Sequence, residues 1–87
     1  MLGRDAHFDA VEVARAKVTD VQNAAHTVRL RCLDALAAAS QATGDEPGHP
    51  VARVALESVI VLSLKTDELI AMCVESRERL AEYGRIF

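Results

Sequence analysis

Apolar residues recur at alternating intervals of three and four through the first half of the chain. This spacing is a heptad, which places its members along one stripe of an α-helix. The members are mostly small side chains: Val11, Ala14, Val18, Val21, Ala25, Val28, Cys32, Ala35 and Ala39. Leu30, Leu33 and Leu36 widen the stripe toward its end. The widening indicates that this helix meets more than one neighbour.

The start of this helix carries a capping pattern. Asp9 followed by Glu12 forms a capping box, in which each side chain bonds the free backbone N–H of the other residue. Phe8 and Val13 have the spacing of a hydrophobic staple around that cap. The sequence therefore predicts a helix over residues 10–43, with residues 1–8 frayed.

A run of turn-forming residues occupies positions 44–49. Gly44 suits the left-handed conformation that ends many helices. Pro50 suits the first position of a helix, where its missing N–H is not needed. A second helix is expected from Pro50 to Tyr83, ended by Gly84. Two helices of roughly 50 Å joined by a short turn predict an antiparallel hairpin.

The second helix has its own heptad, and we expect the two heptads to pack as one seam. Its members are Ala52, Ala55, Val59, Leu62, Thr66, Leu69, Cys73, Ser76, Leu80 and Tyr83. The segment Val59–Leu62 is rich enough in β-branched residues to allow a strand as the alternative. The heptad on both sides of this segment favours the helix.

Further apolar residues of the second helix lie outside its heptad. On a helical wheel Val54, Val61 and Met72 fall together, away from the seam, and Ile60 and Leu64 lie on the opposite flank. A helix that is apolar nearly all round needs more than one neighbour. The sequence thus predicts an all-α fold, a two-helix hairpin that assembles with a second chain into a four-helix bundle. These five residues are the predicted partner interface.

Composition narrows the possible partners. The chain of 87 residues forms one domain, 1–87, and a chain this short buries only about 60% of its extended surface. A net charge of −3 argues against nucleic acid, whose phosphates need a basic surface. The longest uncharged run, 58–64, is too short to insert into a membrane. The first residues lack the apolar core of a cleavable signal peptide.

Cys32 and Cys73 are the two cysteines. If the chain folds back near residue 47, Cys32 faces Val61 and Cys73 faces Asp20. The sulfurs are then roughly 18 Å apart along the helices, whereas a disulfide spans Cα atoms no more than about 7 Å apart. We expect two buried thiols, and an intermolecular bridge is the alternative.

No residue pattern indicates catalysis, a cofactor or a metal. His7, His26 and His49 are never three or four residues from one another or from a cysteine, so no set of ligands converges. We expect His26 to be a partly buried structural side chain beside the seam. The glutamates of the second helix fall mostly on its outer face, as a solvated stripe. The sequence predicts a protein that is not an enzyme and binds no cofactor.

The layout resembles the small helical hairpins of type VII (ESX) secretion. The resemblance rests on the turn Gly44–Gly48 (GDEPG), on His7-Phe8-Asp9 near the start, and on the ending Leu80-Ala81-Glu82-Tyr83. It is closest to the actinobacterial, WXG-like branch without the Trp-x-Gly turn, since this chain has no tryptophan. The export motif of the family is a tyrosine with an acid four residues later. Here Phe87 stands at that distance from Tyr83.

This resemblance implies a function in protein export. It implies a non-enzymatic secretion substrate, or the heterodimer partner of one, that pairs with itself or with a paralogous hairpin and engages the type VII machinery. Such a protein is cytoplasmic when assembled and is exported without a cleavable signal peptide. The alternative is a cytosolic dimerisation or adaptor module, such as the partner-binding subunit of a toxin–antitoxin or regulatory pair.

The histidine spacing yields a first testable prediction. Because no ligand set converges, removal of divalent metals with a chelator should leave the melting temperature of the protein unchanged. Thermal melts followed by circular dichroism with and without chelator measure this. A drop of several degrees would reveal a metal site, with His26 the first residue to replace.

Overall fold

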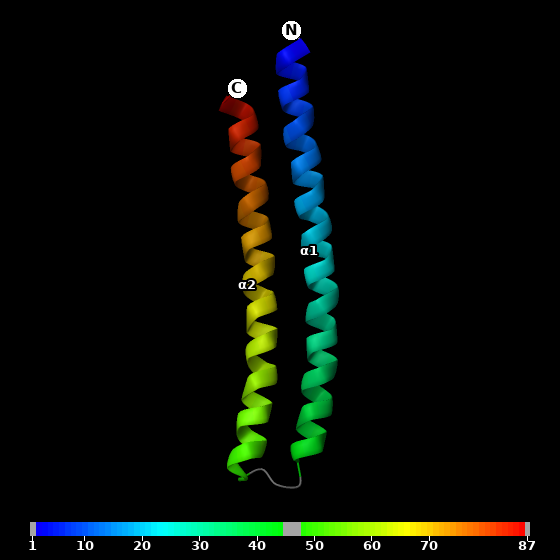
Figure 1. Cartoon of the computed structure of the whole chain (residues 1–87), viewed down its shortest axis with the longest axis vertical. Coiled ribbons are helices and arrows are strands. Elements are labelled where there is room, and N and C mark those ends of the chain that lie inside the picture. Colours follow the sequence, from blue (N-terminus) through cyan, green and yellow to red (C-terminus); the bar gives the residue numbers. More distant parts are fainter. Residues whose placement is uncertain (1, 45–47, 87) are drawn as a thin grey trace.

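The computed structural model describes residues 2–44 and 48–86 of the chain. Two helices, α1 (Leu2–Thr43) and α2 (Pro50–Ile86), account for nearly all of them. They run antiparallel and side by side, so that the start of α1 and the end of α2 lie at the same end of the molecule (Figure 1). The predicted all-α hairpin is confirmed, and the segment Val59–Leu62 is helical rather than a strand.

The first helix begins earlier than predicted. It runs from Leu2, so Asp9 lies inside the helix and the capping box at that position is wrong. Glu12 instead accepts a hydrogen bond from Arg15, with 3.1 Å between Oε1 and Nη1. The early turns also contact α2, because the ring of His7 packs edge-on against Tyr83. This contact supports helix that would fray if the first turns stood alone.

The two glycines expected to end the helices do not adopt the left-handed conformation. Gly44 donates its N–H to the carbonyl of Gln41, with 3.4 Å between N and O, which tightens the end of α1. Gly84 continues α2, so the predicted end at Tyr83 is wrong. A Cβ at Gly84 would lie 3.2 Å from Cγ1 of Val11, so the glycine permits a close approach of the helices. The predicted turn residues 45–47 lie outside the described residues.

The start of α2 is capped by a residue that the sequence analysis left without a role. Pro50 is the first helical residue, as predicted. The backbone N–H of Val51 donates to Nδ1 of His49 over 3.1 Å, and the N–H of Arg53 donates to the His49 carbonyl over 3.0 Å. His49 therefore satisfies an otherwise free N–H of the first turn, the task that serine or aspartate usually performs.

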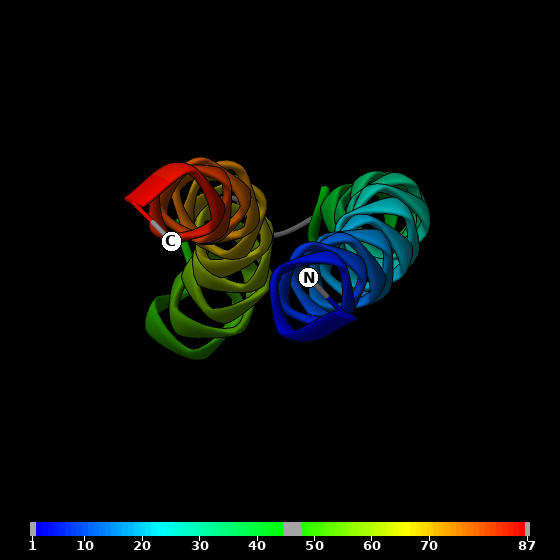
Figure 2. The ribbon, with the colours of Figure 1, turned by 90° about the horizontal axis from the view of Figure 1, so that it is seen from above.

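The helices wind around each other along a rod of 68 × 17 × 12 Å (Figure 2). A heptad contact requires such winding, and its hand is left. Two cross-helix contacts fix the register: Arg77 donates to Thr19 over 3.2 Å, and Arg29 pairs with Asp67 over 2.6 Å. The predicted register, with Asp20 opposite Cys73, would have placed Thr19 opposite Val74. Thr19 instead contacts Arg77, three residues further along α2, so the observed register differs from the predicted one by nearly one helical turn.

The core between the helices is thin. Among the described residues its buried positions are Val11, Ala25, Cys32, Thr66 and Cys73. Both cysteines are free thiols, as predicted. The accessible surface is 6560 Å², whereas a compact monomer of 9.4 kDa exposes about 5,000 Å². The hairpin thus leaves roughly 1,500 Å² more surface in water than a globular chain of its mass.

The cap at His49 yields a second testable prediction. His49→Ala should lower the free energy of unfolding by about 0.5–1 kcal/mol, because the N–H of Val51 loses its acceptor. His49→Asp should equal or exceed the original stability, because a carboxylate accepts the same bond and favours a helix N-terminus. Denaturant melts at one fixed protein concentration measure both. Equal stability of all three chains would contradict the capping role.

Candidate functional site

The residues of each helix can be grouped into rows that run along the helix and repeat every seven positions. Four of these rows define the contact between the helices and the exposed surface beside it. The core row is the half of each predicted heptad that lies between the helices, and all of its members are buried or half-buried. It comprises Val11, Val18, Ala25, Cys32 and Ala39 of α1 with Ala52, Val59, Thr66, Cys73 and Leu80 of α2. For this row the predicted seam is confirmed.

The second contact row differs from the prediction. The seam row, four residues after each core position, completes the contact between the helices, and nine of its ten members are half-buried. It comprises Arg15, Gln22, Arg29, Leu36, Thr43, Leu56, Ser63, Ile70, Arg77 and Gly84. Arg29 and Arg77 reach Asp67 and Thr19 of the opposite helix from this row. These polar contacts hold the helices together along the more polar flank of the core row.

The more apolar flank is left open to solvent. The face row, three residues after each core position, was predicted, apart from Ala42, to lie in the seam, and that prediction is wrong, because nine of the ten members of the row are exposed. It comprises Ala14, Val21, Val28, Ala35, Ala42, Ala55, Leu62, Leu69, Ser76 and Tyr83. Val21 is 51% exposed, and Leu62 is 55% exposed. Large aliphatic side chains therefore lie half in water where a core was expected.

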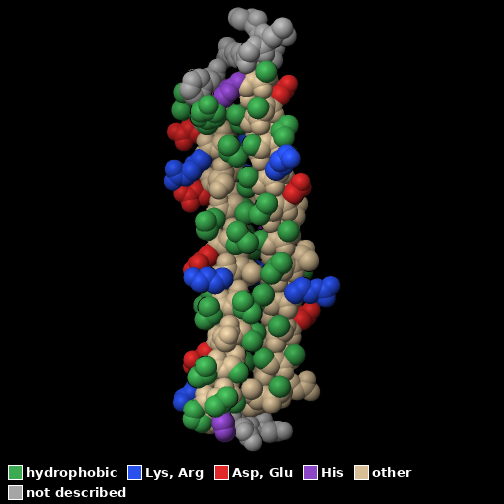
Figure 3. Space-filling model, in the orientation of Figure 1, with side chains coloured by type: hydrophobic (Ala, Val, Ile, Leu, Met, Phe, Trp, Pro, Cys, Tyr) green, Lys and Arg blue, Asp and Glu red, His purple; other side chains and the backbone are tan. Residues whose placement is uncertain are grey.

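The face rows of both helices lie on one side of the hairpin. His7, one heptad before Ala14, meets Tyr83 with ring centroids 4.9 Å apart, so the ends of the two rows touch. Apolar side chains run along this side over both helices, and charged side chains stay at its two outer edges (Figure 3). We call this surface the apolar face. It runs from His7 to Ala42 on α1 and from Ala55 to Tyr83 on α2.

The edges of the apolar face are basic. The rim row, six residues after each core position, has four charged members among the described residues, Lys17, Arg31, Lys65 and Arg79, and all four are exposed. Its other described members are Ala10, Ala24, Ala38, Val51, Ser58, Met72 and Ile86.

The two rim cations of α2 are already paired within their own helix. Lys65 contacts Glu68 at 3.3 Å, and Arg79 contacts Glu75 at 2.6 Å. The hydrogen bond and the charge of Glu75 raise the pKa of Arg79 above its usual value, so this rim position stays cationic at every physiological pH. The glutamates of both pairs belong to the row behind the rim, on the side of α2 away from the face.

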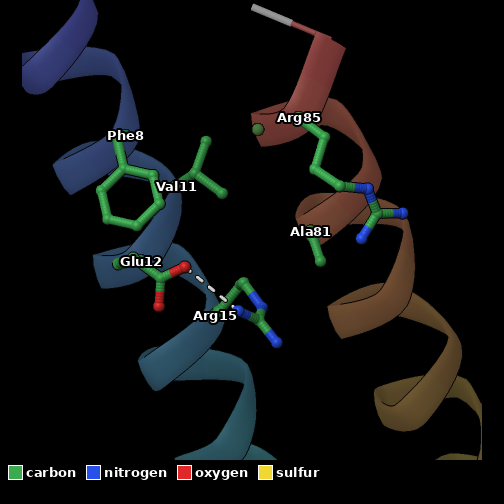
Figure 4. A pocket seen from close by; sticks show the side chains of 7 residues that line it. Phe8, Val11, Glu12, Arg15, Ala81 and Arg85 are labelled. Carbon is green, nitrogen blue, oxygen red and sulfur yellow. Dashed lines mark hydrogen bonds and ion pairs between the residues drawn. The ribbon is translucent and has the colours of Figure 1, made fainter.

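A small groove lies on the other side of the hairpin, near the ends of its arms. It measures about 180 Å³ and is lined by residues that include Phe8, Glu12 and Arg15 of α1 and Ala81 and Arg85 of α2 (Figure 4). Ligand pockets usually exceed about 300 Å³. Glu12 is held by Arg15 in an ion pair of 3.1 Å. Gly84 and Val11, where the helices approach closely, also line the groove.

The five residues predicted to contact a partner are all exposed. Met72 belongs to the rim row and borders the apolar face. Val54 and Val61 lie on the back of α2, and Ile60 and Leu64 lie toward the opposite side. They therefore spread over several rows rather than forming one surface. Their contact with a partner remains a prediction.

The remaining candidates for chemistry do not converge. His26 is exposed rather than partly buried, because it lies on the outer flank next to core residue Ala25. Among the described residues no three histidine, cysteine or acidic side chains gather as metal ligands. Neither helix, over its described length, is apolar enough to cross a bilayer.

Comparisons with known proteins returned no match to any family model, curated protein or solved structure. The function of the chain therefore has to be argued from the apolar face itself.

The apolar face yields a third testable prediction. Leu62→Glu should weaken association with any partner that covers the face, because it would bury an unpaired charge at a cost of several kcal/mol. Val61→Glu, on the neighbouring residue at the back of α2, is the matched control. Self-association at high micromolar concentration, measured by sedimentation velocity, should fall for Leu62→Glu alone. Loss of association in Val61→Glu alone would place the interface on the five originally predicted residues.

Proposed function

We propose that this chain is a non-enzymatic, partner-binding helical hairpin whose apolar face is covered by two helices of a second chain. The observation that carries the proposal is the exposure of the face row, since nine of its ten members are exposed to solvent. A row of valines and leucines at heptad spacing is a core pattern, and soluble proteins rarely leave such a pattern uncovered over a long surface.

The heptad pattern supports a four-helix bundle in particular. In such a bundle each helix directs its core and face rows to the centre, and the two flanking rows meet the two neighbouring helices. The hairpin already shows one of these contacts, along the seam row. The rim row is in position for the other contact. A second hairpin laid on the apolar face would complete the arrangement.

The free energy gained by covering the apolar face is comparable to the cost of association. Burial of a whole Val or Leu side chain contributes about 1.5–3 kcal/mol. The four largest aliphatic residues of the face row, Val21, Val28, Leu62 and Leu69, are already about half-buried. Covering them contributes about 3–6 kcal/mol per chain, and association itself costs about 4–15 kcal/mol. The apolar contact drives binding, and polar groups at its edge can decide the partner.

The setting we propose for this binding is type VII secretion, with the chain as a substrate or as the partner of one. The long antiparallel hairpin, the helical Tyr83 near the end of α2 and the open face support this reading. In the family resembled here, members typically pair as four-helix bundles. Without an acid at position 87 this chain fits the partner that accompanies a signal-bearing hairpin. The alternative is a cytosolic adaptor, for which the same face would serve a regulatory protein.

An export assay tests this proposal. The chain, expressed in a host with an active type VII system, should reach the culture medium only when the ATPase of that system is functional. Leu62→Glu should remain in the cells, because a chain that cannot assemble cannot accompany its partner, whereas Val61→Glu should be exported like the parent. Retention of the parent chain in cells that export other substrates would favour the adaptor role.

A further inference from the structure

The apolar face could be covered by a second copy of the chain or by a different protein. We infer that its partner is a different helical chain, one that carries acidic residues on both edges of its own apolar stripe. This inference rests on the proposed function, since it specifies what the proposed interface recognises. It is drawn from the charges of the rim row.

The rim row flanks the apolar face on both outer edges. Its charged members are Lys17 and Arg31 on α1 and Lys65 and Arg79 on α2. All four are cations, and no acidic residue occupies this row within α1 or α2 as the structure describes them. Whatever packs on the face must bring its own flanking rows next to these positions.

A second copy fits this arrangement poorly. Two hairpins packed face to face would set the four rim cations of one chain against those of the other. The result does not depend on orientation, because the rims of α1 and α2 are both basic. Like charges at the flanking positions of a helical bundle select against that pairing. The acids Glu68 and Glu75 are turned to the back of α2 and already pair with Lys65 and Arg79 of the same chain.

The arginines of the seam row show how a cation beside the core row is paired when a helix packs against it. On the seam row Arg29 meets Asp67 of the opposite helix at 2.6 Å, and Arg77 donates to Thr19 at 3.2 Å. Two of the three seam arginines thus find an acceptor on the facing helix, and the third, Arg15, pairs with Glu12 of its own helix. On α1 the rim cations Lys17 and Arg31 have no ion pair within the described part of the chain. A partner with glutamate or aspartate at its flanking positions supplies the missing acceptors.

The test compares self-association of three forms of the full chain by sedimentation equilibrium. The rim-neutral form carries Lys17→Gln and Arg31→Gln. The control form carries Arg53→Gln and Arg85→Gln, which remove the same charge from exposed positions outside the rim. If the rim repels a second copy, the rim-neutral form should self-associate roughly three- to tenfold more tightly than the parent at low salt. The control form should match the parent, and the difference should shrink as salt is added.

A mixing experiment tests the acidic partner directly. The chain with Lys17→Glu and Arg31→Glu presents the same apolar face with an acidic α1 rim, and its helicity is verified by circular dichroism. It should bind the parent chain more tightly than the parent binds itself. The corresponding Arg53→Glu with Arg85→Glu chain should not.

The outcomes separate this inference from the proposed function. A parent chain that self-associates as tightly as the rim-neutral form at every salt concentration would identify a second copy as the occupant and overturn the inference alone. If no form associates with itself or with another form, even at high salt, the apolar face does not bind helices and both proposals fail.

Discussion

Two helices can cover only one flank of each other's core row, and the architecture of this chain follows from that limit. A heptad stripe has two flanks, and in a hairpin one of them turns away from the mate. Here the flank turned inward is the more polar, with three arginines, a glutamine, a serine and a threonine among its ten members. The flank turned outward has no charged member, and its large side chains are Val21, Val28, Leu62, Leu69 and Tyr83. The chain is therefore built with its most apolar surface outside.

The closed seam is held by specific polar contacts more than by apolar burial. Thr66, at the centre of α2, is buried and donates its hydroxyl to the carbonyl of Ser63 over 2.8 Å, which lets a polar side chain lie among apolar ones. The amide oxygen of Gln22 and the hydroxyl of Ser63 are buried without a hydrogen-bond partner in the described structure. Groups of this kind reduce stability. A seam so composed fixes the register of two helices but contributes little to their association.

The sequence was sufficient for the two-helix hairpin, the start of α2 at Pro50 and the core row, because heptad spacing and a proline act locally. It was not sufficient for the side on which the helices meet. The two flanks lie about 40° and about 60° from the core row, and Val21 or Leu62 is a better core residue than Gln22 or Ser63. The choice depends on pairs distant in sequence, such as Arg29 with Asp67.

The same limit explains the errors at the helix ends and at the candidate site. Asp9 has a capping pattern, but contacts between His7 and Tyr83 extend the helix past it. Gly84 is the residue type that often ends a helix, but here it lies inside α2, at the point where α2 approaches Val11. The predicted partner residues lie outside the face row, because the face row was itself predicted to be buried in the seam. The capping role of His49 could not be predicted from the sequence, because histidine seldom caps a helix.

The thin core has a consequence for the lifetime of the chain. Five buried residues provide little resistance to opening, so an uncovered hairpin spends a larger fraction of time unfolded than a typical domain of its length. Proteases cut chains in that open state, at a rate that follows its population. Binding by a second chain lowers that population by mass action. Turnover would then remove copies that lack a partner first, and the cellular amount of this protein would follow the amount of whatever covers its face.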